Sequence, residues 1–188
     1  MVMIQAEDLL EKRKFKKLLW KKYHFSYLAF FLLISKLLAG VLVSILQVFA
    51  FLAIALFWDI ELPINGYFAI VPALFLSGMM LGALGMFLSS AIKQLENFAG
   101  VMNFVIFPMF FTSSALYPLW KIRESSEILF YFCSFNPFTH AVELIRFSLY
   151  GQLHEKSLIF VCFFLAIFLM LAIYGYDPSK GLIGKKKI

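Results

Sequence analysis

The sequence predicts an all-α membrane protein with four transmembrane helices and a re-entrant amphipathic helical hairpin on the outer side. The chain is 62% hydrophobic and only 15% charged, whereas soluble domains are about half apolar and about a quarter charged. Four apolar stretches reach the roughly 20 residues that a helix needs to cross a bilayer. The segment between the last two stretches is too polar to span and too apolar to be a free loop.

The apolar stretches place the spans at about 37–58, 67–92, 98–117 and 157–176. Residues 37–176 are therefore expected to form a single transmembrane domain, with the re-entrant segment at about 118–152. Residues 1–36 read as a basic and amphipathic N-terminal segment, and residues 177–188 as a basic tail. Aromatic residues that favour the headgroup layer mark the ends of the spans, and they are Trp58, Tyr67, Tyr117, Tyr174 and Tyr176.

The distribution of basic residues predicts the orientation. If the N-terminus lies in the cytoplasm, only four of the 17 Lys and Arg residues fall on the outer side. These are Lys121, Arg123, Arg146 and Lys156. This positive-inside pattern places both termini of the multi-pass chain in the cytoplasm. The net charge of +6 is concentrated at the chain ends, which predicts contact with membrane lipids rather than nucleic acid.

No pattern in the sequence predicts catalysis, a cofactor or a metal site. Cys133 and Cys162 are far apart in apolar surroundings and are interpreted as small buried residues. No GxxxxGK[ST] loop is present to bind nucleotide phosphates. His140, Glu143 and Arg146 lack a nucleophile, and one histidine with one carboxylate is a poor metal site. We therefore expect no enzyme activity in this chain.

Small and polar residues within the spans predict where helices meet. Gly78, Gly82 and Gly85 lie three and four residues apart in the second span and allow close helix approach. They predict helix packing within one subunit, with a dimer seam or a substrate-facing groove as the alternative. Gln47 in the first span and Asn103 in the third need hydrogen-bond partners in hydrocarbon. These two amides either join spans or face a translocation path.

Two short amphipathic helices are predicted in the re-entrant segment, at about 125–134 and 138–150. Between them, Asn136 is placed to cap the second helix, and Pro137 suits its first position. The second helix is expected to seal the outer end of a pathway through the membrane.

The second of these helices carries three ionisable residues on one broad face, because His140, Glu143 and Arg146 are spaced by three. Glu143 and Arg146 form either a structural ion pair or a contact with a substrate or its exit route. The remaining circumference is largely apolar, so we expect the charged stripe to face water or a neighbouring helix.

The order of these features resembles the C-terminal two-thirds of a type-2 ABC exporter permease (ABC-2 type). An outer-turn motif follows the third span, and a re-entrant motif opens the segment before the last span. The matching positions are Ser114, Ala115, Leu116, Tyr117 and Pro118, then Asn136, Pro137, Thr139, Ala141 and Arg146. Ser114 stands where the family usually has glycine. The run "FPMFFTSSALYPLWKIRESSEILFYFCSFNPFTHAVELIRFSLYGQ" is further similar to permeases encoded beside quinoprotein (PQQ-dependent) alcohol dehydrogenase systems.

The resemblance implies a membrane-spanning permease subunit of an ATP-driven exporter in the bacterial inner membrane. Such a subunit moves a small or lipid-like molecule, pairs with a second permease copy and leaves ATP hydrolysis to a separate ABC ATPase. The candidate ATPase contacts are the basic stretch 11–22 and the turn 93–97. The alternatives are that the basic stretch binds anionic lipid and that the turn is simply solvated.

One departure from the family concerns length. Permeases of this class have six spans, and the four predicted here resemble the third to the sixth, so the first two are absent from this sequence. This departure leaves open a non-transporting membrane scaffold, a truncated and inactive permease fragment, or one half of a split permease.

Overall fold

The computed structural model describes residues 30–58, 63–92 and 95–175. All regular secondary structure in these ranges is α-helical, which confirms that the fold is all-α. The basic stretch 11–22, the start of the turn 93–97 and the tail 177–188 lie outside the described residues.

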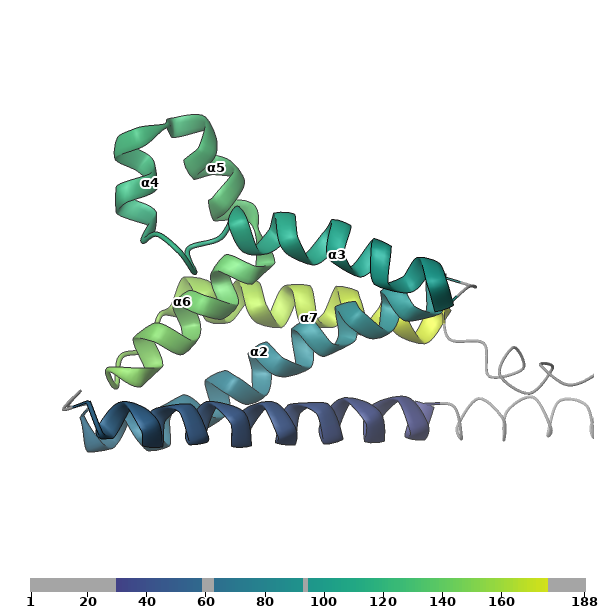
Figure 1. Cartoon of the computed structure of the whole chain (residues 1–188), viewed down its shortest axis with the longest axis horizontal. Helices are drawn as coiled ribbons and strands as arrows, with labels where there is room; N and C mark the ends of the chain where they lie inside the picture. The colour runs from purple at the N-terminus through teal and green to yellow at the C-terminus, as the bar shows by residue number, and fades with distance from the viewer. Residues whose placement is uncertain (1–29, 59–62, 93–94, 176–188) are drawn as a thin grey trace, which may run out of the picture.

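Seven helices account for most of the described chain. The first, Phe30–Leu56, is drawn without a label at the start of the chain in Figure 1. The others are α2 (Ile64–Ala91), α3 (Leu95–Phe111), α4 (Leu119–Ser125), α5 (Glu127–Phe135), α6 (Pro137–Leu149) and α7 (Glu155–Gly175).

Three of these helices are long and apolar enough to cross a membrane by themselves: Phe30–Leu56, α2 and α7. The α5 and α6 helices satisfy the same test only as a pair, and the pair is bent by 80° at Asn136. The described part of the chain therefore holds three candidate spans, or up to four if the bent pair counts as one. A bend of this size fits either a broken span or a re-entrant loop.

The third predicted span, 98–117, is shorter in the structure. α3 has 17 residues, which is about 26 Å of helix against a hydrocarbon core of about 30 Å. The hydroxyl groups of Thr112 and Ser113 donate to the carbonyl oxygens of Pro108 and Phe110 at 2.7 and 2.6 Å. Such local bonds offer the backbone an alternative to a further helical turn. The end of α3 therefore needs hydrogen-bond partners from elsewhere in the fold.

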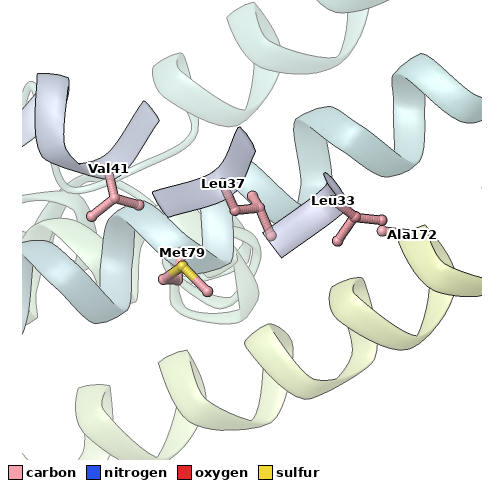
Figure 2. Close-up of a cluster of buried hydrophobic side chains, with 5 residues drawn as sticks. All are labelled: Leu33, Leu37, Val41, Met79 and Ala172. Carbon is pink, nitrogen blue, oxygen red and sulfur yellow. The ribbon is translucent and has the colours of Figure 1, made fainter. Parts of the chain in front are cut away.

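The α2 helix is central to the packing. Among α3 to α7, it contacts α7 most extensively and then α6, whereas α3 touches it only sparsely. Figure 1 shows α4 and α5 projecting from this group as a hairpin. Figure 2 shows how Leu33, Leu37 and Val41 of the first helix meet Met79 of α2 and Ala172 of α7 in a buried cluster.

Glycine residues on α2 allow two of these close approaches. A Cβ at Gly78 would lie 3.3 Å from the Val41 side chain, and one at Gly82 would lie 2.9 Å from the end of Leu37. These two glycines therefore face the helix Phe30–Leu56 of the same subunit. The sequence analysis did not single out Gly66, where the approach is closer still. A Cβ at Gly66 would overlap the backbone carbonyl group of Leu149, the last residue of α6.

The outer surface of the described helices is strongly apolar. Phe51, Phe68 and Phe104 are each more than two-thirds exposed, although they lie in the middle or near the ends of apolar helices. A surface of this kind is expected where the solvent is lipid rather than water. The molecule is therefore built as a membrane protein.

We predict that Gly66→Ala destabilises the fold, because a backbone carbonyl group cannot move aside as a flexible side chain can. Overpacking of this type costs about 1–3 kcal/mol. The matched control is Gly40→Ala, since a Cβ at Gly40 meets nothing within 4 Å. Unfolding by SDS titration in mixed micelles measures both variants, and equal stability of the two would contradict the α2–α6 contact.

Candidate functional site

The candidate site is the junction between the end of α3 and the bent α5–α6 pair. Asn136 occupies the bend, where its Oδ1 accepts a hydrogen bond from the backbone N–H of Phe138 at 2.9 Å. Pro137 is the first residue of α6, a position where its missing N–H is no loss. The cap and the proline at the start of this helix are thus as the sequence predicts.

The other end of α6 is closed by a glycine. Gly151 has φ 72°, a left-handed conformation that favours residues without a side chain. The N–H of Gly151 donates to the carbonyl oxygen of Ser148 at 2.9 Å, and that of Gln152 to Phe147 at 3.0 Å. This pair of bonds is a Schellman motif. Both ends of α6 are therefore set by local sequence.

Asn136 also closes the end of α3. Its Nδ2 donates to the carbonyl oxygen of Met109 at 2.7 Å, and lies 3.1 Å from both the carbonyl oxygen and the Oγ1 of Thr112. The last four carbonyl groups of a helix have no partner within it, and in a bilayer an unpaired group costs several kcal/mol. One side chain therefore begins α6 and terminates α3.

Two further side chains of α6 hold the turn that follows α3. The Thr139 Oγ1 accepts from the N–H of Ser114 at 3.3 Å, and Arg146 Nη2 donates to the Ser114 carbonyl oxygen at 2.8 Å. Arg146 Nη1 donates to Glu143 Oε1 at 3.0 Å. The ion pair is present, and the same guanidinium group also binds the turn. We call Asn136, Thr139, Glu143 and Arg146, with the 112–114 turn that they hold, the α3–α6 clamp.

The clamp joins the two motifs that the resemblance identified separately. Thr139 and Ser114 are fully buried, and Glu143 is 7% exposed. Elsewhere in the outer-turn motif, Ala115 N–H donates to Ser113 Oγ at 3.2 Å, Leu116 is exposed, and Pro118 precedes α4.

Ser114 carries an unsatisfied hydroxyl group. Its Oγ is buried without a hydrogen-bond partner in the described structure. An orphaned hydroxyl of this kind is a free-energy cost. The clamp binds the backbone N–H and carbonyl oxygen of Ser114 rather than its side chain.

His140 points to different neighbours from Arg146. Its Nε2 donates to the carbonyl oxygen of Ser134 at 2.8 Å, and its ring stacks on Phe160 with centroids 4.1 Å apart. Its Nδ1 lies 3.4 Å from Ser157 Oγ, which in turn lies 2.7 Å from His154 Nδ1. The histidine therefore connects α5, α6 and α7, and the three ionisable residues of α6 do not act as one group.

The two amides predicted within the spans are not buried in the subunit. Gln47 on the first helix and Asn103 on α3 are both exposed. They do not lie at the clamp, and burial inside one subunit is not their role. Gly85 is half-buried on α2.

The sequence analysis missed the partners of the clamp. The carbonyl oxygens of Met109 and Thr112 receive the Asn136 amide, and backbone acceptors carry no signal in a sequence. A polar triplet beginning at Thr112, after a long apolar run, was the available sign that the helix ends there. In the described residues, no three His, Cys, Asp or Glu side chains are grouped as metal ligands.

We predict that Asn136→Asp is at least as destabilising as Asn136→Ala. Aspartate is as good a helix N-cap as asparagine, so capping alone would tolerate it. The clamp would not, because a carboxylate oxygen would face the carbonyl oxygens of α3. An orphaned buried acceptor costs about 1–3 kcal/mol, measured here by SDS titration.

The control for this substitution is Ser126→Asp. Ser126 caps α5, accepting from Leu129 N–H, and a carboxylate there should be neutral. If Asn136→Asp were as neutral as Ser126→Asp, the conclusion that the Asn136 amide closes the end of α3 would be wrong.

Comparison with known proteins adds the family. The family described as ABC-2 type transporter matches residues 9–150. Nodulation protein J of Rhizobium leguminosarum bv. viciae is 22% identical over 116 residues, which are 62% of this chain and 42% of that protein. The chain thus covers less than half of this curated relative, and no solved structure matches. Because the family match extends over most of the sequence and includes both motifs of the clamp, the chain belongs to the ABC-2 type transporter family.

Proposed function

We propose that this chain exports a small or lipid-like molecule across the inner membrane as one of two permease copies, powered by a separate ABC ATPase. The family is a membrane component of ABC transporters. To this we add the direction of transport, the class of cargo, the second permease copy and the ATPase partner. The observation that carries it is the α3–α6 clamp.

The clamp supports a mechanical role for α3. The carbonyl groups at its outer end are held by Asn136, and the turn beyond them is held by Thr139 and Arg146. These hydrogen bonds link the end of α3 and the turn after it to α6. A displacement of the end of α3 would therefore reach α6 through them. In the proposed cycle, ATPase closure moves the inner end of α3, and the clamp transmits that movement to the bent pair at the outer end of the pathway.

The exposed amides support a second copy or a lined path. Gln47 and Asn103 lie on apolar helices, yet they are exposed on the subunit surface. A side-chain amide in hydrocarbon needs a hydrogen-bond partner. A neighbouring permease copy or a hydrated pathway would supply one, whereas lipid tails would not.

A non-transporting membrane scaffold is the second candidate, because apolar helices and a hydrogen-bonded clamp would serve a structural membrane protein as well as a permease. The two candidates differ in what they do to an ATPase, because only a coupled permease changes its rate of ATP turnover.

We expect the full chain in nanodiscs to bind the ABC ATPase encoded nearest to its gene and to raise its ATP turnover. Arg146→Ala should reduce this stimulation several-fold while co-purification persists, because the clamp lies at the opposite end of α3 from the proposed ATPase contact. Arg123→Ala is the control, since Arg123 lies over the Phe130 ring outside the clamp. Absence of both binding and stimulation would favour the scaffold.

The proposed orientation is tested by cysteine accessibility in intact cells, in a background with Cys133→Ser and Cys162→Ser. Gln152 and Lys36 are both exposed and lie on opposite sides of the predicted membrane. Gln152→Cys should react with a membrane-impermeant maleimide, and Lys36→Cys should react only after the cells are opened. The reverse pattern would reject the orientation.

A further inference from the structure

A groove runs between the helix Phe30–Leu56 and α2, away from the clamp. Its volume is about 1280 Å³. The lining is amphipathic. Polar residues of the lining are Lys36, Ser44, Ser77, Ser89 and Ser90, and apolar residues include Leu37, Val41, Leu74, Leu81, Met86 and Ile145. The groove is therefore suited to a molecule with both a polar and an apolar part.

The contacts of the two α2 glycines give the register along the groove. Leu37 lies opposite Gly82, and Val41 lies opposite Gly78. In this register Lys36 lies one residue beyond the level of Gly82, and Ser77 lies one residue beyond the level of Val41 in the opposite direction. Lys36 and Ser77 are therefore six helical residues apart, which is about 9 Å along the groove. Ser89 and Ser90 lie further out, near the end of α2.

Ser77 is a residue of the groove whose hydroxyl group lacks a hydrogen-bond partner among the described residues. It is 2% exposed, it lines the groove, and its Oγ has no hydrogen-bond partner in the described structure. Ser44 and Ser90, by contrast, donate to the carbonyl oxygens of Gly40 and Phe87. A buried hydroxyl group without a partner costs about 1–3 kcal/mol. A ligand that accepts a hydrogen bond at this depth would remove that cost.

We propose that this groove binds an anionic glycerophospholipid, with its phosphate at Lys36 and an ester carbonyl at Ser77. Lys36 carries its ammonium group on a flexible four-carbon stem, so this group can reach a phosphate that lies one glycerol unit from an ester carbonyl at Ser77. The acyl chains would continue along Leu74, Val48 and Ile145, which line the groove beyond Ser77. Lys36 complements the charge of the phosphate, and the predicted orientation places it beside the cytoplasmic leaflet, where anionic lipids are found.

This site is independent of the proposed transport cycle, since it shares no residue with the clamp. The test uses the full chain and native mass spectrometry, with defined lipids added to the delipidated protein. The probes are phosphatidylglycerol, phosphatidylcholine and an ether-linked phosphatidylglycerol that lacks ester carbonyls. The unaltered protein should retain ester-linked phosphatidylglycerol in preference to both of the other lipids.

Two substitutions assign the preferences to residues. Lys36→Gln should weaken retention of phosphatidylglycerol about fivefold, the factor that corresponds to about 1 kcal/mol per basic residue near anionic lipid. Ser77→Ala should remove the preference for the ester-linked lipid and leave the charge preference intact. Lys156→Gln and Ser35→Ala are the matched controls, because both residues are exposed and neither lines the groove.

Three kinds of outcome in these measurements would contradict the proposal. Equal retention of phosphatidylglycerol and phosphatidylcholine, or no effect of Lys36→Gln, would mean that the groove does not select a phosphate. Equal retention of ester- and ether-linked lipid by the unaltered protein would overturn the assignment of Ser77 without any variant. If a second copy of the chain fills the groove, no lipid is retained and the proposal is wrong.

Discussion

The side-chain amide of Asn136 satisfies two helix ends at once, and the junction of α3 with the bent α5–α6 pair depends on it. Its oxygen begins α6 by accepting from Phe138 N–H, and its nitrogen ends α3 by donating to Met109 and Thr112 carbonyl oxygens. Water would satisfy such groups at the surface of a soluble protein. In a low-dielectric environment they need protein partners. An amide can do this because its donor nitrogen and its acceptor oxygen are separate atoms held in one plane. A serine hydroxyl donates and accepts at a single atom, and an aspartate carboxylate only accepts.

The charged groups near this amide are bound by protein partners. Arg146 uses one nitrogen for Glu143 and another for the Ser114 carbonyl oxygen. The fork of a guanidinium group offers two separate nitrogens for these acceptors, whereas a lysine ammonium group offers one. Because Glu143 is almost fully buried, removal of Arg146 would leave a carboxylate without its counter-charge. The Glu143–Arg146 ion pair and the 112–114 turn are thus joined through a single guanidinium group.

The packing of the helix Phe30–Leu56 against α2 and α7 is organised differently. Here the contacts are apolar and close, with Gly78 and Gly82 of α2 facing side chains of the first helix and a buried cluster joining that helix to α7. The polar exceptions, Lys36 and Ser77, line a groove instead of pairing with one another across it. A protein with a hydrogen-bonded clamp at one end and an amphipathic groove toward the other has two regions whose functions can be separated.

Local chemistry was sufficient to predict the helices and the ends of α6. Apolar runs predicted spans at about 37–58, 67–92 and 157–176, which overlap Phe30–Leu56, α2 and α7, because hydrocarbon admits only backbone that bonds within itself. Asn136 and Pro137 predicted the start of α6. Tertiary structure alone decided which groups these residues meet. It ended α3 at Phe111, directed His140 away from Arg146, placed Gly66 against Leu149, and left Gln47 and Asn103 on the surface. The reason is that a sequence shows where a donor is but not its acceptor. The backbone oxygens that accept from Asn136 and Arg146 are more than twenty residues away and come close only when the helices pack.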